Sequence, residues 1–94
     1  MSYIISQPYV MVERRIKDYK QQYIEVKEYL YLYETSVSSK TKQFHLHHIF
    51  DISYKPTDGR YGFLYLHTNQ GVISYQVTED PYSFIEAFRK LINK

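Results

Sequence analysis

The histidines are the residues whose types and spacing most directly suggest metal chemistry. His45, His47 and His48 lie close together, and His67 follows further along the chain. Histidines at i and i+2 of a strand share a face and can reach one ion, and Asp51 is the nearest acidic residue that could join them. The chain contains no Cys, which excludes a thiolate site, a thiol nucleophile and disulfides. A structural or solvent-exposed role for the histidines is the competing interpretation, and we adopt it and expect no metal and no cofactor.

A cluster of basic residues is the second candidate, for anion binding. Its members are Arg14, Arg15, Lys17 and Lys20, in a segment that we predict to be a loop. The whole chain has 12 basic and 10 acidic residues, a balance too even to indicate a nucleic-acid or membrane binder from bulk charge. Two interpretations therefore stay open: a loop that holds an anionic group, or a loop that is simply solvated.

Tyrosine is unusually frequent, at 12 of 94 residues. In the predicted strand that ends near Glu34, the tyrosines Tyr29, Tyr31 and Tyr33 alternate with Leu30 and Leu32, so that the three rings share one face. Tyrosine is enriched at protein interfaces because it offers rigid apolar area with a polar tip. We predict a partner-binding face here, for a protein partner or for self-association, which Tyr61, Phe63 and Tyr65 could extend. The alternative is that a curved sheet and nearby Arg and Lys stems cover these rings.

The inventory for catalysis is thin. The sequence has hydroxyl, imidazole and carboxylate groups, but it lacks a G-x-S-x-G elbow, a phosphate-binding glycine loop and a paired-carboxylate spacing. We therefore expect that the protein is not an enzyme.

The elements that position these residues are clearest near the C-terminus. Side chains alternate between two faces through residues 61–68, with Gly62, Leu64, Leu66 and Thr68 on one face, and apolar and polar side chains alternate from Ile73 to Thr78. The intervening Thr68 to Gly71 has turn chemistry, which predicts a hairpin. Pro81, preceded by the N-cap acceptor Asp80, begins a predicted helix. The apolar residues of this helix form one arc: Phe84, Ile85, Phe88, Leu91 and Ile92.

The upstream segments predict further strands. We expect the first strand to be interrupted or bent at Pro8, which cannot donate to a ladder. A straight strand from Tyr23 to Glu34 would bury Glu28 among aliphatic side chains, so we predict a hairpin or sharp bend near Lys27 and Glu28. A loop is expected over residues 35–43, and the change of apolar phase at His48 predicts a bulge or corner.

This order, strands first and one terminal helix, predicts a single domain over residues 1–94. The predicted fold class is mainly β with one C-terminal helix: a bent antiparallel barrel or sandwich of six or seven strands, capped by the helix. No apolar run approaches the length that spans a bilayer, and the start of the sequence lacks the apolar region of a signal peptide, so we expect a cytoplasmic protein.

The apolar spacing also resembles that of the small bacterial pleckstrin-homology-like (PH-like) domains, from about Tyr23 onward. The matching pattern comprises Phe44, Leu46, Ile49, Ile52, the segment 62–66, then Ile73, Tyr75, Val77, Pro81, Phe84, Ile85, Phe88 and Leu91. The resemblance implies a seven-stranded, strongly bent antiparallel barrel capped by the C-terminal helix, and a binding or scaffolding role. The lipid-binding branch of the family holds a phosphate in its first hairpin loop, where Arg14 to Lys20 fall, but its helix typically carries a Trp, and this chain has none.

These observations predict a non-enzymatic protein-interaction or scaffolding domain. The alternative is a membrane-surface adaptor that makes weak contact with anionic lipid head groups through the segment from Arg14 to Lys20. Nucleic-acid binding through the same segment is disfavoured.

Overall fold

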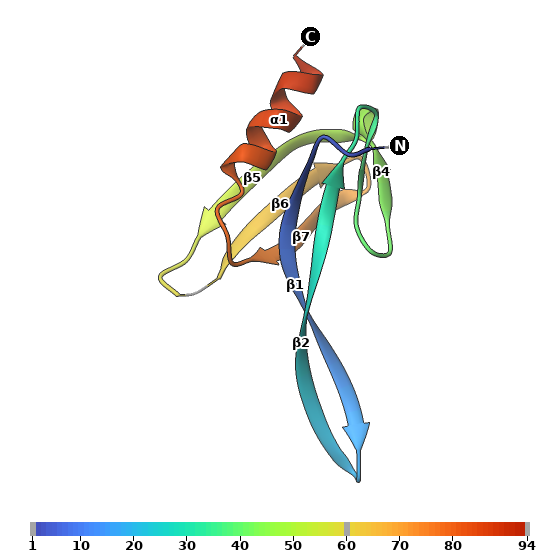
Figure 1. Cartoon of the computed structure of the whole chain (residues 1–94), viewed down its shortest axis with the longest axis vertical. Coiled ribbons are helices and arrows are strands. Elements are labelled where there is room, and N and C mark those ends of the chain that lie inside the picture. Colours follow the sequence, from blue (N-terminus) through green and yellow to red (C-terminus); the bar gives the residue numbers. More distant parts are fainter. Residues whose placement is uncertain (1, 60, 94) are drawn as a thin grey trace.

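A computed structural model describes residues 2–59 and 61–93 of the chain (Figure 1). Within these residues the order of elements is β1 (Ile5–Lys17), β2 (Lys20–Leu32), β3 (Ser36–Ser38), β4 (Gln43–His45), the 3-10 helix η1 (Leu46–His48), β5 (Ile49–Pro56), β6 (Gly62–Thr68), β7 (Gly71–Val77) and α1 (Tyr82–Ile92). The prediction of a mainly β fold with one C-terminal helix is confirmed. None of the described helices combines the length and apolar character needed to cross a bilayer.

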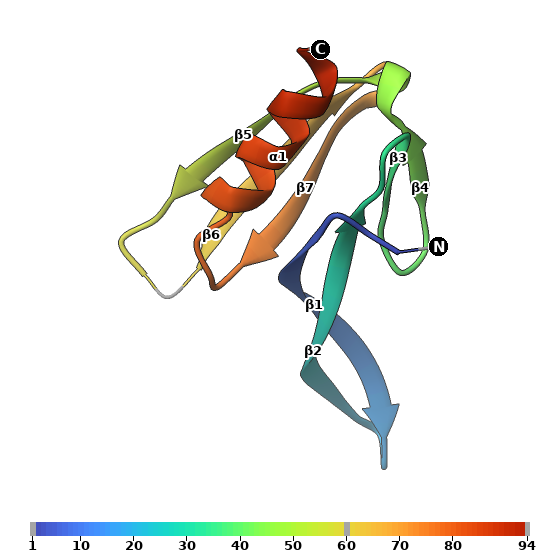
Figure 2. The same ribbon diagram turned by 45° about the horizontal axis from the view of Figure 1, so that its top comes forward.

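The seven strands form one antiparallel sheet in the order β4-β3-β2-β1-β7-β6-β5. The two edge strands, β4 and β5, are consecutive in the chain and are joined only by η1, so the sheet must curl until its edges meet at that corner (Figure 2). Within the described residues β4 and β5 do not pair, and the sheet is not closed into a barrel. Closure would need a ladder between the edges, and β4 is only three residues long.

The core fills the inner face of the curled sheet and is covered by α1. Among the described residues, the buried hydrophobic core comprises Tyr9, Leu30, Leu32, Val37, Ile49, Ile52, Leu64, Leu66, Val77, Phe84, Ile85 and Phe88. The predicted alternation along β6 is therefore confirmed, because Leu64 and Leu66 are buried and their neighbours Phe63, Tyr65 and His67 are half-buried. Because Phe84, Ile85 and Phe88 come from α1, the helix supplies a large part of the core and is docked on the sheet.

The helix begins one residue later than predicted, at Tyr82, with Pro81 as the N-cap. The Asp80 carboxylate still accepts a hydrogen bond from the backbone N–H of Tyr82, at 2.9 Å. On the solvent side, Arg89 donates to the backbone oxygen of Ile52 at 3.3 Å and its Nε lies 3.6 Å from Asp51. These contacts hold α1 against β5.

The predicted interruption at Pro8 is wrong, because β1 continues through it and Pro8 lies opposite Tyr29. In an antiparallel pair, successive residues point their backbone groups alternately toward and away from the partner strand. Val10 pairs with Gln76 of β7, and so points away from β2. Pro8, two residues earlier, points the same way, so its missing N–H removes no hydrogen bond between β1 and β2.

The predicted break near Lys27 and Glu28 is also wrong. Strand β2 is continuous over 13 residues, and Glu28 lies on its inner face. Its carboxylate is only half-buried and lies 3.2 Å from Nζ of Lys40, in the connection between β3 and β4. The cost of a buried charge is thus avoided by an ion pair with a distant residue and not by bending the strand.

Two segments predicted as loops contain strand residues. Residues 14–17 end β1 and Lys20 begins β2, so only Asp18 and Tyr19 form the turn, both with positive φ (53° and 63°). Residues 35–43 contain β3 and the start of β4. The corner expected at His48 is confirmed, since η1 carries the chain from one edge of the sheet to the other and a register shift follows between Ile49 and Asp51.

Candidate interaction surface on the β1–β2 arm

The β1–β2 hairpin extends far beyond the rest of the sheet. Val10 with Gln76 is the one pair between β1 and β7 among the described residues, and β3 pairs with β2 only at Tyr31 and Leu32. Residues 11–27 therefore pair only with each other, and we call them the arm. The arm makes the molecule elongated, at 54 × 30 × 26 Å, and points away from the core and the helix (Figure 1).

The ladder between β1 and β2 gives two faces to the arm and to the base of the hairpin from which it extends. Tyr9, Leu30 and Leu32 belong to the inner face, which leads into the core. The opposite, outer face consists of Ser6, Pro8, Val10, Val12, Arg14 and Ile16 on β1 and Gln21, Tyr23, Glu25, Lys27, Tyr29 and Tyr31 on β2. The outer face is thus one continuous surface from the tip of the arm to the tyrosines at its base.

Two of the predicted partner-binding tyrosines, Tyr29 and Tyr31, lie side by side on this outer face, with ring centroids 6.2 Å apart. Tyr29 is exposed, and Tyr31 is half-buried because Tyr3 packs on it with a centroid distance of 4.9 Å. The Lys27 ammonium lies 5.7 Å from the Tyr29 centroid. The rings are therefore partly covered by their neighbours and still leave an accessible aromatic surface.

Tyr33 does not lie beside Tyr29 and Tyr31 on the strand, contrary to the prediction. It follows the end of β2, where its backbone N–H donates to Ser36, and its side chain lines a hollow of about 860 Å³ together with Tyr3, Ser38 and Gln43. Of the three tyrosines predicted to share one face, Tyr29 and Tyr31 therefore do so on β2, and Tyr33 lies beyond the end of this strand.

Sequence reasoning missed the apolar residues of the arm itself. Val12, Ile16, Tyr19 and Tyr23 are all exposed, Ile16 at 72% and Tyr23 at 67%. The alternation of Val10, Val12 and Ile16 was the available signal. It was hidden because Arg14 interrupts it and because the basic residues suggested a loop.

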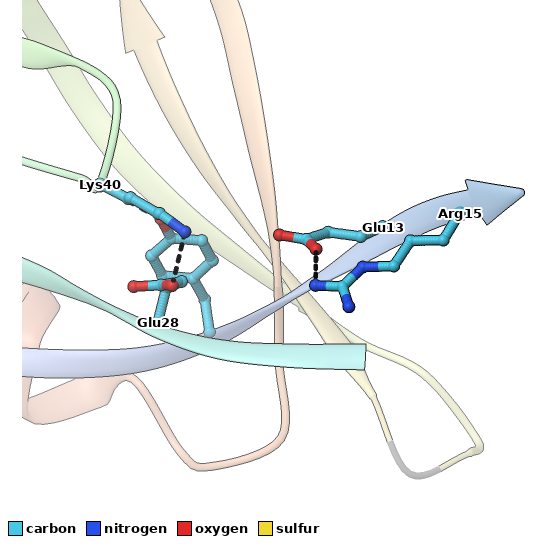
Figure 3. Close-up of polar contacts among 5 residues, drawn as sticks. Glu13, Arg15, Glu28 and Lys40 are labelled. Carbon is cyan, nitrogen blue, oxygen red and sulfur yellow. Dashed lines mark hydrogen bonds and ion pairs between the residues drawn. The ribbon is translucent and has the colours of Figure 1, made fainter. Parts of the chain in front are cut away.

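The four predicted anion-binding residues all lie near the tip of the arm, but they do not share a face. Arg14 is on the outer face, whereas Arg15, Lys17 and Lys20 are on the inner face. Arg15 also forms an ion pair with Glu13 at 3.1 Å, as Figure 3 shows. All four side chains are exposed, so the tip is an exposed basic surface and not a formed pocket.

The predicted extension through Tyr61, Phe63 and Tyr65 is a separate patch. Strand β6 is separated from β2 by β1 and β7 in the sheet, and the rings of Phe63 and Tyr65 stack on each other at 6.2 Å. Tyr61 connects the two patches, because its hydroxyl donates a hydrogen bond to Glu25 of the arm.

The histidines do not form a metal centre in the part of the chain that the structure describes, where no group of three His, Cys, Asp or Glu side chains could hold an ion. The His45 and His47 rings stack at 4.7 Å, and His45 Nδ1 accepts from the His47 backbone N–H at 3.2 Å, as a cap of η1. His67 lies elsewhere, 2.7 Å from the Ser53 hydroxyl. His45 thus caps η1, whereas His67 of β6 contacts the neighbouring strand β5.

A hollow of about 420 Å³ opens where β1 and β7 separate, and its walls include Tyr9, Ser39, Lys42, Ile73 and Tyr75. The Tyr9 and Tyr75 rings meet edge to face at 4.9 Å. Burial raises the pKa of Tyr75 above its ordinary value, and a hydrogen bond with Ser39 lowers it in part. Tyr75 is therefore a neutral wall residue at physiological pH.

No protein-family model matches this chain, and searches of curated proteins and of solved structures find no match to it.

Proposed function

We propose that the chain is a non-enzymatic protein-interaction domain of PH-like type that binds its partner with the outer face of the arm. The observation that carries this proposal is the arm itself. It adds nothing to the buried core beyond its base, yet it displays Val12, Ile16 and Tyr23 to solvent, in line with the exposed Tyr29 at its base.

The energetics of such an element favour a binding role. A two-stranded ribbon alone is marginally stable in water, and a third strand or a packed face is needed to stabilise it. A contiguous exposed apolar surface on a small domain often marks an interaction site. Tyr23 and Tyr29 suit such a site because they bury a large area and lose little conformational entropy.

The proposed PH-like type is supported by the strand topology. Seven antiparallel strands followed by a docked C-terminal helix are what the resemblance implies. The chain differs in its open seam between β4 and β5 and in the length of its first hairpin.

Affinity capture from cells of the native host tests the proposal. We expect the wild-type chain to capture a protein that the double variant Tyr29→Ser with Tyr31→Ser does not, since both rings are lost from the outer face. The matched control is Phe63→Ser with Tyr65→Ser, which removes two rings from the separate patch on β6 and should capture as the wild type does. Equal recovery by all three chains would contradict the proposal.

The second candidate function is contact with an anionic membrane surface, favoured by the composition of the tip. Between Arg14 and Tyr23 there are four basic residues and one acidic residue, Asp18, and the exposed Ile16 and Tyr19 lie among them. Basic residues next to interfacial apolar side chains bind anionic lipid surfaces.

Vesicle flotation tests this second function. The chain should float with vesicles that contain phosphatidylserine, less so at high salt, and Arg14→Glu with Lys17→Glu should abolish flotation. Equal recovery with neutral and anionic vesicles would exclude it.

A further inference from the structure

We propose that the free edge of β2 pairs with the same edge of a second copy of the chain, antiparallel and centred on Val26. This inference rests on the proposed function, because it names the partner as a second copy and the contact as a strand ladder. It is carried by the direction of the backbone groups of β2 and by the order of its charges.

The backbone directions along β2 follow from its base. The Leu32 oxygen accepts from Ile4, on the β1 side, whereas the Tyr33 N–H donates to Ser36, on the β3 side. Because directions alternate along a strand, the odd-numbered residues of β2 point their N–H and C=O groups away from β1. From Tyr23 to Tyr29 no described strand occupies that side, so these groups face outward at an open edge.

An open strand edge is a template for another strand, and charged side chains restrict which register it accepts. Residues that point outward must lie opposite one another in the new ladder. A two-fold pairing centred on Glu25 places this residue opposite its own copy, and one centred on Lys27 does the same for Lys27. Like charges directly opposite destabilise a ladder, which disfavours both registers.

Centring the pairing on Val26 gives the complementary arrangement. Glu25 then lies opposite Lys27 of the second copy, and by symmetry this ion pair forms twice. Tyr23 lies opposite Tyr29 of the second copy, also twice, on the same outer face. Both cross-strand combinations, opposite charges and aromatic pairs, stabilise antiparallel sheets.

A register centred on Ile24 is less favourable. It places Tyr23 opposite Glu25 on the outer face. On the inner face it places Lys20 opposite Glu28, which Lys40 of the same chain already neutralises. Of the four registers compared, the one centred on Val26 combines opposite charges with aromatic pairs on the outer face, and it is the one that we propose.

The paired arms would form a four-stranded sheet in the order β1-β2-β2-β1, which supplies the neighbour that an isolated ribbon lacks. The ladder runs from Tyr23 to Tyr29 and stops before Tyr31, where β3 already pairs. Two existing contacts adjoin this ladder. Lys27 lies 3.7 Å from Glu79 in an exposed pair, and Glu25 accepts a hydrogen bond from Tyr61 through Oε1.

Disulfide trapping tests the register, since the chain has no Cys of its own. In the proposed dimer the two Val26 positions form a non-hydrogen-bonded pair, whose close Cα separation suits a disulfide. The two Ile24 positions lie four residues apart along the ladder, about 13 Å, beyond the reach of a disulfide. We expect Val26→Cys to give on the order of tenfold more cross-linked dimer under mild oxidation than Ile24→Cys, because only the first satisfies this geometry. Equal cross-linking of the two variants overturns the register.

Exchanging the charges of Glu25 and Lys27 tests the pairing of the two copies without introducing a covalent bond. We expect the mass of the wild-type chain by light scattering to rise from monomer to dimer with concentration. Glu25→Lys should keep the chain monomeric, and Glu25→Lys combined with Lys27→Glu should restore the dimer because the ion pairs re-form with exchanged partners. A wild-type chain that stays monomeric at all concentrations overturns the inference. It would leave the proposed function standing if host-cell capture still depends on Tyr29 and Tyr31, so the two failures can be told apart.

Discussion

Nζ of Lys40 lies 3.2 Å from Oε1 of Glu28, and this ion pair joins the β3–β4 connection to the middle of β2 (Figure 3). The backbone N–H of the same Lys40 lies 3.4 Å from the Tyr9 hydroxyl. The two contacts hold the connection over the inner face where the arm leaves the sheet.

We expect the Glu28–Lys40 pair to contribute modestly to stability, because both side chains are partly exposed to solvent. A double-mutant cycle with Glu28→Gln and Lys40→Gln should give a coupling of about 0.5 kcal/mol in urea unfolding, reduced at high salt. A coupling that is absent at low salt would contradict the role given to this pair.

Tyr19 should be replaceable with a gain in stability. It lies in the left-handed region and its side chain is fully exposed, so Tyr19→Gly relieves the backbone at no cost in packing. We expect local opening of the arm to become harder by about 1 kcal/mol, which slows amide exchange of Ile24 and Val26 about fivefold. Tyr19→Ala is the control, since it keeps a Cβ atom and should give no gain.

Gly62 should tolerate no side chain. A Cβ atom at this position would lie 2.6 Å from Cε1 of Tyr54, whose ring packs edge to face on Tyr82. We expect Gly62→Ala to lower the free energy of unfolding by about 2 kcal/mol, as overpacking does in well-packed sites. Gly59→Ala is the matched control, because the nearest atom to its Cβ would be 3.9 Å away. Equal stabilities of the two variants would refute this packing.

The raised pKa of Tyr75 predicts how the stability of the fold changes at alkaline pH. Because burial holds its folded-state pKa above the ordinary value of 10.0, the unfolded chain releases this proton first as the pH rises. The stabilising contribution is therefore complete below pH 10.0 and is lost as the pH rises from there through the folded pKa. Tyr75→Phe should flatten the fall of the urea midpoint above that pH, and an unchanged slope would contradict the assignment.

Local pattern was sufficient for the C-terminal half of the fold. Leu64 and Leu66 alternate with half-buried residues, Gly71 permits the positive φ of the turn, and Phe84 and Phe88 lie on one face of a helix. These signals come from residues close in sequence, so the sequence alone predicts the elements.

The arm could not be predicted in the same way. Strand β2 continues through Glu28 because its carboxylate pairs with Lys40, twelve residues later in the chain. No local sequence pattern indicates this ion pair. The turn at Asp18 and Tyr19 lacks the Asn-Gly or Asp-Gly pair that marks a two-residue hairpin. The predicted site residues Tyr29 and Tyr31 were placed on the correct face, but the surface that continues from them depends on this missed hairpin.

The arm is proposed to be the part of the molecule that binds another protein. A shortened chain tests it most directly: an Asn-Gly turn replaces residues 12–25 and joins Met11 to Val26, a pair with the same ladder geometry as Lys17 and Lys20 at the natural turn. The core residues are untouched, so the shortened chain should melt as one folded domain. In quantitative capture from host cells it should lose the proteins that the wild type retains, whereas retention of the same proteins by the folded, shortened chain would contradict the account.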